Sequence, residues 1–126
     1  MSDASGSSGG RRLHHLLLQT SDLQKAEDFY VGFLGFGVKN RGPFPDGRPL
    51  TVTNEGLGLT NGAWAPAGSV VEHFAFRASD IRGIAERAVA AGVHVIKGPG
   101  PGPYGLTVYL ADPDGNKVEM FSEDED

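Results

Sequence analysis

Apolar and polar residues alternate along several short stretches of the chain, as in strands that bury one face. Two longer stretches carry apolar residues at helical spacing instead, first Leu23, Ala26, Tyr30 and Phe33, and then Ile81, Ile84, Ala85, Ala88 and Val89. This pattern predicts helices at about 22–34 and 80–91. Strands are expected near 13–19, 37–41, 71–77 and 93–97, on both sides of 55–56, and on both sides of 112–115. The predicted fold class is α+β.

The two halves of this pattern repeat each other. Residues 15–23 read HLLLQTSDL and residues 73–81 read HFAFRASDI, at an offset of 58 residues. A helical pattern and three further strands follow each segment, which is the signature of a duplicated unit. Each half is therefore expected to be a βαβββ module, at about 13–62 and 70–122, within one domain at 13–122.

The last two predicted strands form a hairpin that carries an acid in an apolar setting. Residues 109–121 read YLADPDGNKVEMF, and the Asp-Pro-Asp-Gly stretch within them is a strong turn signal. Glu119 follows between two apolar residues, and a buried carboxylate requires a cation or a hydrogen-bond donor. The first half has a corresponding hairpin, and aligning its Gly56 with Gly115 places Thr60 opposite Glu119.

The repeat gives His15 and His73 equivalent positions near the start of a strand in each half. Two histidines and one carboxylate, here Glu119, form a ligand set that leaves coordination positions of a metal open for water or substrate. Such a site suits Fe(II), Mn(II), Zn(II), Ni(II) or Co(II). The alternative is that each histidine is a structural residue of its strand. Strand alternation is expected to point His14 away from His15, and His94 is interpreted as structural or exposed.

Composition narrows the classes of partner. The 126 residues carry a formal net charge of −5, which gives no electrostatic basis for binding nucleic acid or an anionic membrane. No apolar run is long enough to span a bilayer. The absence of cysteine excludes disulfides and thiolate chemistry and is compatible with the cytosol, so a cytoplasmic protein is expected.

Several segments are expected to lie outside regular structure or to face solvent. Residues 1–12, rich in Gly and Ser, predict a flexible tail, and the acidic residues 123–126 predict a solvated one. The alternating Gly and Pro of residues 98–103 predict a loop that is neither a helix nor a central strand. Glu27, Asp28, Glu72 and Glu86 are interpreted as ordinary solvated acids.

Taken together, these motifs resemble the vicinal oxygen chelate superfamily. The similarity lies in H-x-x-L-x-x-S-D-L, in E-H-x-A-F and in Y-x-x-D-P-D-G-N-x-V-E, and it covers about residues 13–122. The family includes glyoxalases, bleomycin-resistance proteins, fosfomycin-resistance enzymes and extradiol ring-cleaving dioxygenases. The resemblance implies two βαβββ modules in a pseudo-two-fold arrangement, a curved sheet forming a cup around a metal, and chains paired as homodimers. Its metal ligands would be His15, His73 and Glu119.

The resemblance also implies roles for residues around this site. Tyr109 and Tyr104 would be catalytic, Tyr109 by donating a hydrogen bond or a proton and Tyr104 by closing over the cup. The substrate-binding residues would be Thr107, Phe44, Trp64 and Thr60. For the aromatic residues among them, packing or dimer contacts are the alternative, and Tyr109 has the alternative of a half-buried strand residue.

The resemblance leaves more than one function open. In the first hypothesis, a bound metal holds two neighbouring oxygens of a small molecule, aromatic substrates included, for ring-cleaving dioxygenation, lyase or isomerase chemistry, or epoxide opening. A glyoxalase-type site adds a ligand from the first-half hairpin, and an extradiol site adds a histidine in the loop that is 98–105 here, which contains none. In the second hypothesis, the protein sequesters a small molecule without chemistry, as bleomycin-resistance proteins do. A third is a purely structural role.

Overall fold

The computed structural model describes residues 13–43, 47–61 and 71–126. The chain divides into two compact units, residues 1–64 and 65–126. Residues 1–12, which the sequence predicts to be a tail, lie outside the described part.

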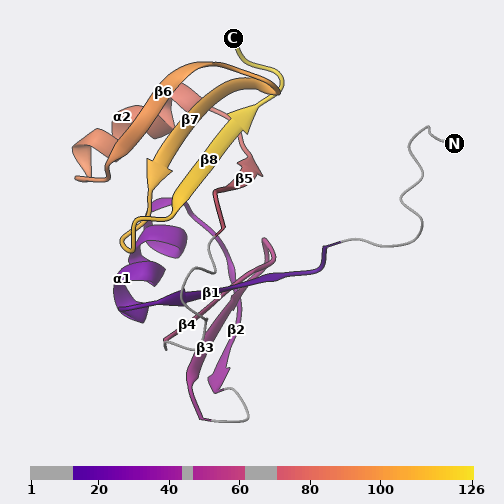
Figure 1. The fold of residues 1–126 in the computed structure, drawn as a ribbon, viewed down its shortest axis with the longest axis vertical. Coiled ribbons are helices and arrows are strands. Elements are labelled where there is room, and N and C mark those ends of the chain that lie inside the picture. Colours follow the sequence, from indigo (N-terminus) through magenta and orange to yellow (C-terminus); the bar gives the residue numbers. More distant parts are fainter. Residues whose placement is uncertain (1–12, 44–46, 62–70) are drawn as a thin grey trace, which may run out of the picture. The chain divides into compact units, whose positions relative to one another are not determined.

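The first unit is a four-stranded mixed sheet with one helical segment (Figure 1). Its strands are β1 (Leu16–Thr20), β2 (Val38–Pro43), β3 (Pro49–Thr53) and β4 (Leu57–Asn61), in the order β1-β4-β3-β2. β1 runs parallel to β4, and the other neighbours are antiparallel. The helical segment begins as α1 (Leu23–Glu27) and continues as a π-helical turn, η1 (Asp28–Phe33). Asp22 caps it by accepting the Lys25 backbone N–H at 3.1 Å.

The second unit repeats this architecture. It contains β5 (Phe74–Arg77), α2 (Ile81–Ala90), β6 (Val95–Gly102), β7 (Gly105–Ala111) and β8 (Lys117–Ser122). Its sheet has the order β5-β8-β7-β6, again with one parallel pair, β5 and β8. The α+β class and the two βαβββ modules predicted from the sequence repeat are therefore confirmed.

Each helical segment packs on its sheet through residues that the helical spacing predicted. In the second unit these are Ile81, Ile84, Ala85 and Ala88 of α2, facing Val108, Leu110, Val118 and Met120 of the sheet. In the first unit Ala26 and Tyr30 are buried as predicted, and α1 packs on β4. Phe29, which the spacing did not predict, is also buried, whereas Leu23 and Phe33 are half-buried. Val89, predicted on the buried face of α2, is instead 72% exposed, because the buried stripe follows positions 81, 84, 85 and 88.

One predicted loop is instead a strand. β6 continues through the alternating Gly and Pro at 98–102 and pairs with β7, with register shifts between Val95 and Gly100. β6 lies at the edge of its sheet, so a proline that lacks a backbone N–H interrupts no ladder on its outer side. The exclusion of a central strand was correct, but the assignment of a loop was wrong.

Glu27 is a structural anchor, and its interpretation as a solvated acid was wrong. Its side chain is only 15% exposed and forms a two-point contact with Arg41 of β2, at 2.7 Å and 3.1 Å. It also accepts a hydrogen bond from the Thr51 hydroxyl of β3. These hydrogen bonds, above all those from Arg41, lower the pKa of Glu27 below its ordinary value. Glu27 therefore ties the helical segment to two strands of the sheet.

The acidic C-terminal segment is also bound rather than solvated. The Glu125 carboxylate accepts the backbone N–H groups of Asp80 at 2.6 Å and Ile81 at 3.0 Å. Asp80 has a φ of 56° and makes no cap with its own side chain, so Glu125 satisfies N–H groups that the start of α2 leaves without partners. Glu123 pairs with Arg77 at 2.7 Å.

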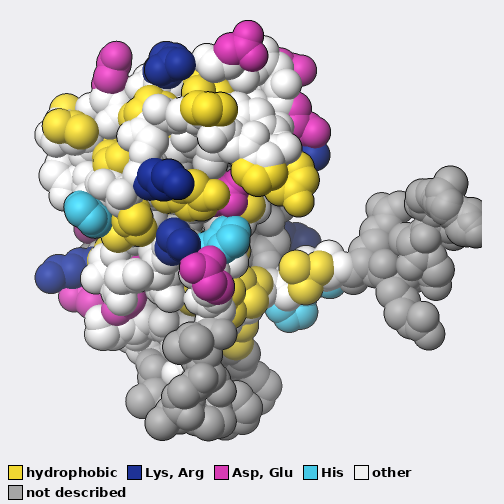
Figure 2. Space-filling view, turned by 45° about the horizontal axis from the view of Figure 1, so that its top comes forward, with side chains coloured by type: hydrophobic (Ala, Val, Ile, Leu, Met, Phe, Trp, Pro, Cys, Tyr) yellow, Lys and Arg dark blue, Asp and Glu magenta, His cyan; other side chains and the backbone are white. Residues whose placement is uncertain are grey.

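None of the helices among the described residues has the length and apolarity needed to cross a membrane. Figure 2 shows acidic and basic side chains interspersed over the described part of the face in view.

Replacing Glu27 with Gln is expected to lower the free energy of unfolding by about 1–2 kcal/mol at pH 7, because the charged hydrogen bonds are lost. The pKa of Glu27 is lowered in the folded state, so its stabilisation is present above the unfolded pKa of about 4.3 and is lost as the pH falls through the folded value. Urea unfolding of both proteins between pH 7 and pH 3 should show the difference shrinking with acidification. A pH-independent difference would contradict this assignment.

Replacing Glu125 with Ala is expected to destabilise the protein by about 0.5–2 kcal/mol, the usual cost of losing a helix cap. The matched control is Asp124→Ala, which removes one acid from the same segment at an exposed position. Thermal or urea unfolding measures both. Equal stabilities for the two variants would show that the Glu125 cap has no energetic role.

Candidate metal and substrate site

Glu119 is presented by the hairpin of β7 and β8. The connecting turn is built on Asp112, whose carboxylate accepts the backbone N–H groups of Asp114 at 2.9 Å and Asn116 at 2.8 Å. It also accepts the Asn116 side-chain amide at 2.8 Å. This turn, which the sequence predicted, fixes a register in which Tyr109 lies directly opposite Glu119.

The two faces of this hairpin have different environments. Val118 and Met120 point toward α2, so alternation turns Glu119 to the opposite face of the sheet. Glu119 is nevertheless only 4% exposed there. Tyr109 and Lys117 share that face, because they alternate in step with Glu119. The hairpin therefore provides a buried carboxylate on the side away from the helix.

His73, which directly precedes β5, lies beside this carboxylate. Its Nε2 lies 3.2 Å from Oε1 of Glu119. The Tyr109 hydroxyl donates a hydrogen bond to Glu119, and the Tyr109 ring meets the His73 ring edge to face, with centroids 6.1 Å apart. Burial, and then the charge of Glu119 and its hydrogen bond, raise the pKa of Tyr109. At neutral pH Tyr109 is thus a protonated donor beside a carboxylate and an imidazole.

The spacing of His73 and Glu119 fits two ligands of one divalent ion. Nitrogen and oxygen ligands bind such ions at about 2.0–2.2 Å, so two ligands in adjacent coordination positions lie about 2.9–3.5 Å apart. The 3.2 Å between Nε2 and Oε1 falls within this range. An imidazole and a carboxylate are also chemically suitable ligands. Among the described residues, no group of three or more His, Asp or Glu side chains suited to a metal lies together.

His15 lies in the first unit, directly before β1. Its Nδ1 lies 2.8 Å from Nδ1 of His14. The expectation that strand alternation separates these two rings was wrong, because both residues precede the strand. The two histidines line a hollow of about 410 Å³ together with Leu17, Lys39, Leu50, Val52, Thr53, Asn54, Gly56 and Gly58.

The strand registers correct the proposed counterpart of Glu119. Leu17 pairs with Gly58 across β1 and β4, and Ala75 pairs with Glu119 across β5 and β8. Leu17 and Ala75 are equivalent in the sequence repeat, so the counterpart of Glu119 is Gly58 and not Thr60. The glycine alignment failed because the second hairpin has a longer turn, residues 112–116, than the first, residues 54–56. The first unit therefore has no side chain where the second has its buried carboxylate.

The other residues predicted to bind substrate or to act in catalysis differ in burial. Thr107 lies on the same sheet face as Tyr109, but it is buried, and its hydroxyl donates to the Gly105 carbonyl at 2.9 Å. Thr60 is also buried and donates to the Pro49 carbonyl at 2.8 Å. Tyr104 is 64% exposed beside Phe121, with ring centroids 5.7 Å apart. Phe44 and Trp64 lie outside the described residues.

Two charged residues at this site were missed by the sequence reasoning. Glu72, interpreted as a solvated acid, contacts Nδ1 of His73 and forms an ion pair with Lys117 at 2.8 Å. The Lys117 ammonium also lies 5.5 Å from the centre of the Tyr109 ring. Lys117 was detectable in principle, because a residue two positions from Glu119 on a strand shares its face. Glu72 had no such signal, because its contact depends on backbone geometry before β5.

Comparisons with known proteins agree with this architecture. The family model of the Glyoxalase/Bleomycin resistance protein/Dioxygenase superfamily matches residues 12–120. The chain belongs to this superfamily. A lactoylglutathione lyase of Neisseria meningitidis is 32% identical over 89% of this chain and 91% of its own length. A lactoylglutathione lyase of Escherichia coli O157:H7 is 27% identical over 89% and 93%.

Solved structures of the superfamily share the fold. The trypanothione-dependent glyoxalase I of Leishmania major superposes with a TM-score of 0.73 at 22% identity, covering 90% of this chain and 87% of that one. TnmS3, an antibiotic-binding protein from Streptomyces sp. CB03234, gives a TM-score of 0.72 at 26% identity, with 89% and 95% covered. The superfamily thus includes both enzymes and a binding protein with this architecture.

Proposed function

We propose that this protein is a divalent-metal-dependent enzyme of the lyase or isomerase class, with His15, His73 and Glu119 as its metal ligands. Its substrate would be a small molecule with two neighbouring oxygen atoms. The observation that carries the proposal is the pair formed by His73 and Glu119, whose 3.2 Å spacing suits two ligands of one ion. The sequence repeat supports His15 as the third ligand, because it is the counterpart of His73.

The residues around the pair support acid–base chemistry. When bound, a divalent ion supplies a Lewis acid that polarises neighbouring substrate oxygens. Tyr109 remains protonated at neutral pH and would donate a hydrogen bond or a proton to a substrate oxygen. Glu119 is buried, and the exclusion of water there would strengthen its electrostatic interactions with the ion and with Tyr109. Thr107, Thr60, Phe44 and Trp64 remain proposed substrate contacts, and Tyr104 remains a proposed catalytic residue.

The lyase class is supported by the relatives named lactoylglutathione lyase, at 27–32% identity. The substrate is proposed to differ from theirs, because a glyoxalase-type site is expected to use a further ligand from the first-half hairpin. Here that position is Gly58, and the space above it is occupied by Leu17 and Leu50, whose methyl groups lie 3.1 Å and 3.8 Å from where a Cβ would be. The metal would then keep more open positions. A homodimer is part of this proposal, as the resemblance implies.

The second candidate function is ligand binding without catalysis. The hollow of about 410 Å³ in the first unit, with apolar Leu17, Leu50 and Val52 among its lining, suits the body of a small apolar molecule. The similarity to an antibiotic-binding protein also favours it. Equal ligand binding by metal-free and metal-loaded protein, with no turnover, would favour this candidate over the enzyme.

The variants His15→Ala, His73→Ala and Glu119→Gln are each expected to reduce bound metal to near zero, because three ligands leave no redundancy. His94→Ala is the matched control, since His94 is exposed and outside the proposed site. Elemental analysis after loading with Fe(II), Mn(II), Zn(II), Ni(II) or Co(II), followed by dialysis, gives the stoichiometry. Unchanged metal content in the first three variants would overturn the ligand assignment. Loaded wild-type protein is then screened for turnover of 1,2-dioxygenated compounds, with the substrate of lactoylglutathione lyases as one arm.

Replacing Gly58 with Glu is expected to tighten metal binding about tenfold, or about 1.4 kcal/mol, by supplying the carboxylate that the first unit lacks. Gly58→Ala is the control, because it imposes the same crowding on Leu17 without a ligand. Titration calorimetry with Zn(II) or Ni(II) compares the two. Equal affinities would show that position 58 does not face the metal.

A further inference from the structure

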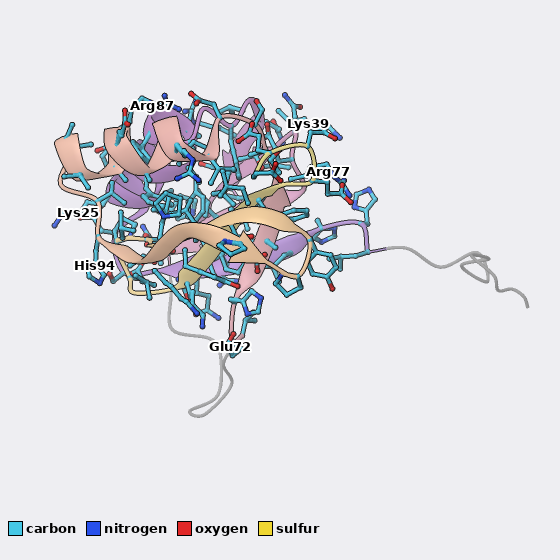
Figure 3. All side chains as sticks on the ribbon, turned by 90° about the horizontal axis from the view of Figure 1, so that it is seen from above. Lys25, Lys39, Glu72, Arg77, Arg87 and His94 are labelled. Carbon is cyan, nitrogen blue, oxygen red and sulfur yellow. The ribbon has the colours of Figure 1, made fainter. Side chains whose placement is uncertain are left out.

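The two nitrogens of His73 have different partners. Nε2 faces Glu119 at 3.2 Å, and Nδ1 contacts a carboxylate oxygen of Glu72. Glu119 is almost fully buried, whereas the Glu72 side chain is 73% exposed. Figure 3 shows Glu72 on one side of the second sheet, with Arg87 of α2 on the other. The imidazole therefore lies between an inner and an outer carboxylate.

The backbone before β5 makes this contact possible. Neighbouring residues within a strand point to opposite faces, so they cannot share a partner or touch each other. Glu72 and His73 precede β5, which begins at Phe74, and are not bound by that alternation. The same holds in the first unit, where His14 contacts Nδ1 of His15 at 2.8 Å before β1. In both units the residue before the repeated histidine thus holds its Nδ1.

The outer carboxylate is itself fixed in place. Oε2 of Glu72 forms an ion pair with Lys117 of β8 at 2.8 Å, which leaves Oε1 for His73. Lys117 is two residues from Glu119 on the same strand and shares its face. These contacts form a closed loop that begins and ends on β8. Lys117 pairs with Glu72, Glu72 contacts His73, and His73 lies beside Glu119.

This arrangement determines which nitrogen of a neutral His73 carries the proton. Both neighbours are carboxylates, which only accept hydrogen bonds when ionised. Nδ1 meets the geometry of a hydrogen bond with Glu72, whereas Nε2 lies only within ion-pair distance of Glu119, so a neutral His73 places its proton on Nδ1. Nε2 then carries the lone pair and can bind a cation. A carboxylate on the far nitrogen is the support that metal-binding histidines commonly receive, and its loss typically weakens metal affinity about 10–100-fold.

We propose that Glu72 is a positioning residue for His73: it holds the Nδ1–H tautomer and directs the Nε2 lone pair toward the site of Glu119, while Lys117 holds Glu72. The metal part of this inference rests on the proposed function. The tautomer part does not, because it concerns contacts within the metal-free chain.

The first experiment measures the His73 tautomer by ¹⁵N NMR in metal-free protein at pH 8, with His73→Gln to assign the signals. Wild-type protein is expected to show Nδ1–H. Glu72→Ala should shift His73 toward Nε2–H, whereas Glu72→Gln should keep Nδ1–H, because the amide oxygen still accepts. Glu86→Ala, another exposed glutamate, is the matched control and should match wild type. Nε2–H or a doubly protonated ring in wild type, or no change in Glu72→Ala, would overturn the proposal.

The second experiment measures Zn(II) or Ni(II) affinity by titration calorimetry. Glu72→Ala is expected to bind about 10–100-fold more weakly than Glu86→Ala, with Glu72→Gln and Lys117→Met in between. Glu72 is exposed, so circular dichroism should show that all variants fold. Equal affinity of Glu72→Ala and Glu86→Ala would refute the positioning role. If wild-type protein binds no metal, the proposed function fails, and the NMR experiment alone decides the role of Glu72.

Discussion

A buried carboxylate on the face of a strand is the constraint around which the second unit is arranged. Glu119 is 4% exposed, and a charge taken out of water must be offset by donors or cations. Tyr109 of the neighbouring strand β7 supplies a hydrogen-bond donor, and Nε2 of His73, the residue before β5, lies 3.2 Å from the carboxylate. Their positions follow from two registers, the parallel pairing of β5 with β8 and the antiparallel pairing of β7 with β8. The turn around Asp112 sets the second of these.

The two units share a topology but differ in the side chains that their last strands carry. Both begin with a histidine that precedes a strand paired in parallel with the last strand of the unit. In the second unit that last strand carries Glu119, and in the first it carries Gly58. The second unit thus has a cluster of acids, a histidine and a tyrosine, and the first has a hollow whose lining includes Leu17, Leu50 and Val52 besides polar side chains. The two units therefore share a fold but present different side chains on the corresponding strand.

This asymmetry bears on how far similarity to lactoylglutathione lyases extends. Identity of about one third over nine tenths of the chain establishes the superfamily and the scaffold. Reactions within a shared fold are decided by a few side chains at the site. In the proposed function Gly58 would be such a position, because adding or removing one carboxylate ligand changes the charge and the open positions of a bound ion. The proposed difference in substrate therefore has a local physical basis.

The sequence by itself determined the fold class, the duplicated βαβββ order and the hairpin that carries Glu119, because periodicity, a nine-residue repeat and turn residues are local properties. The tertiary structure decided what depends on register and on backbone path. It made Gly58 rather than Thr60 the counterpart of Glu119 in the repeat, since turn length cannot be read from one aligned glycine. It extended β6 through the Gly-Pro stretch, because an edge strand tolerates missing donors. It also brought Glu72 to His73, Glu125 to α2, and Glu27 to Arg41 and Thr51. The sequence alone suggests that these acids are solvated. The partners of Glu27 and Glu125 are distant in the sequence, and the contact of Glu72 depends on irregular backbone before β5, which hydrophobic periodicity does not predict.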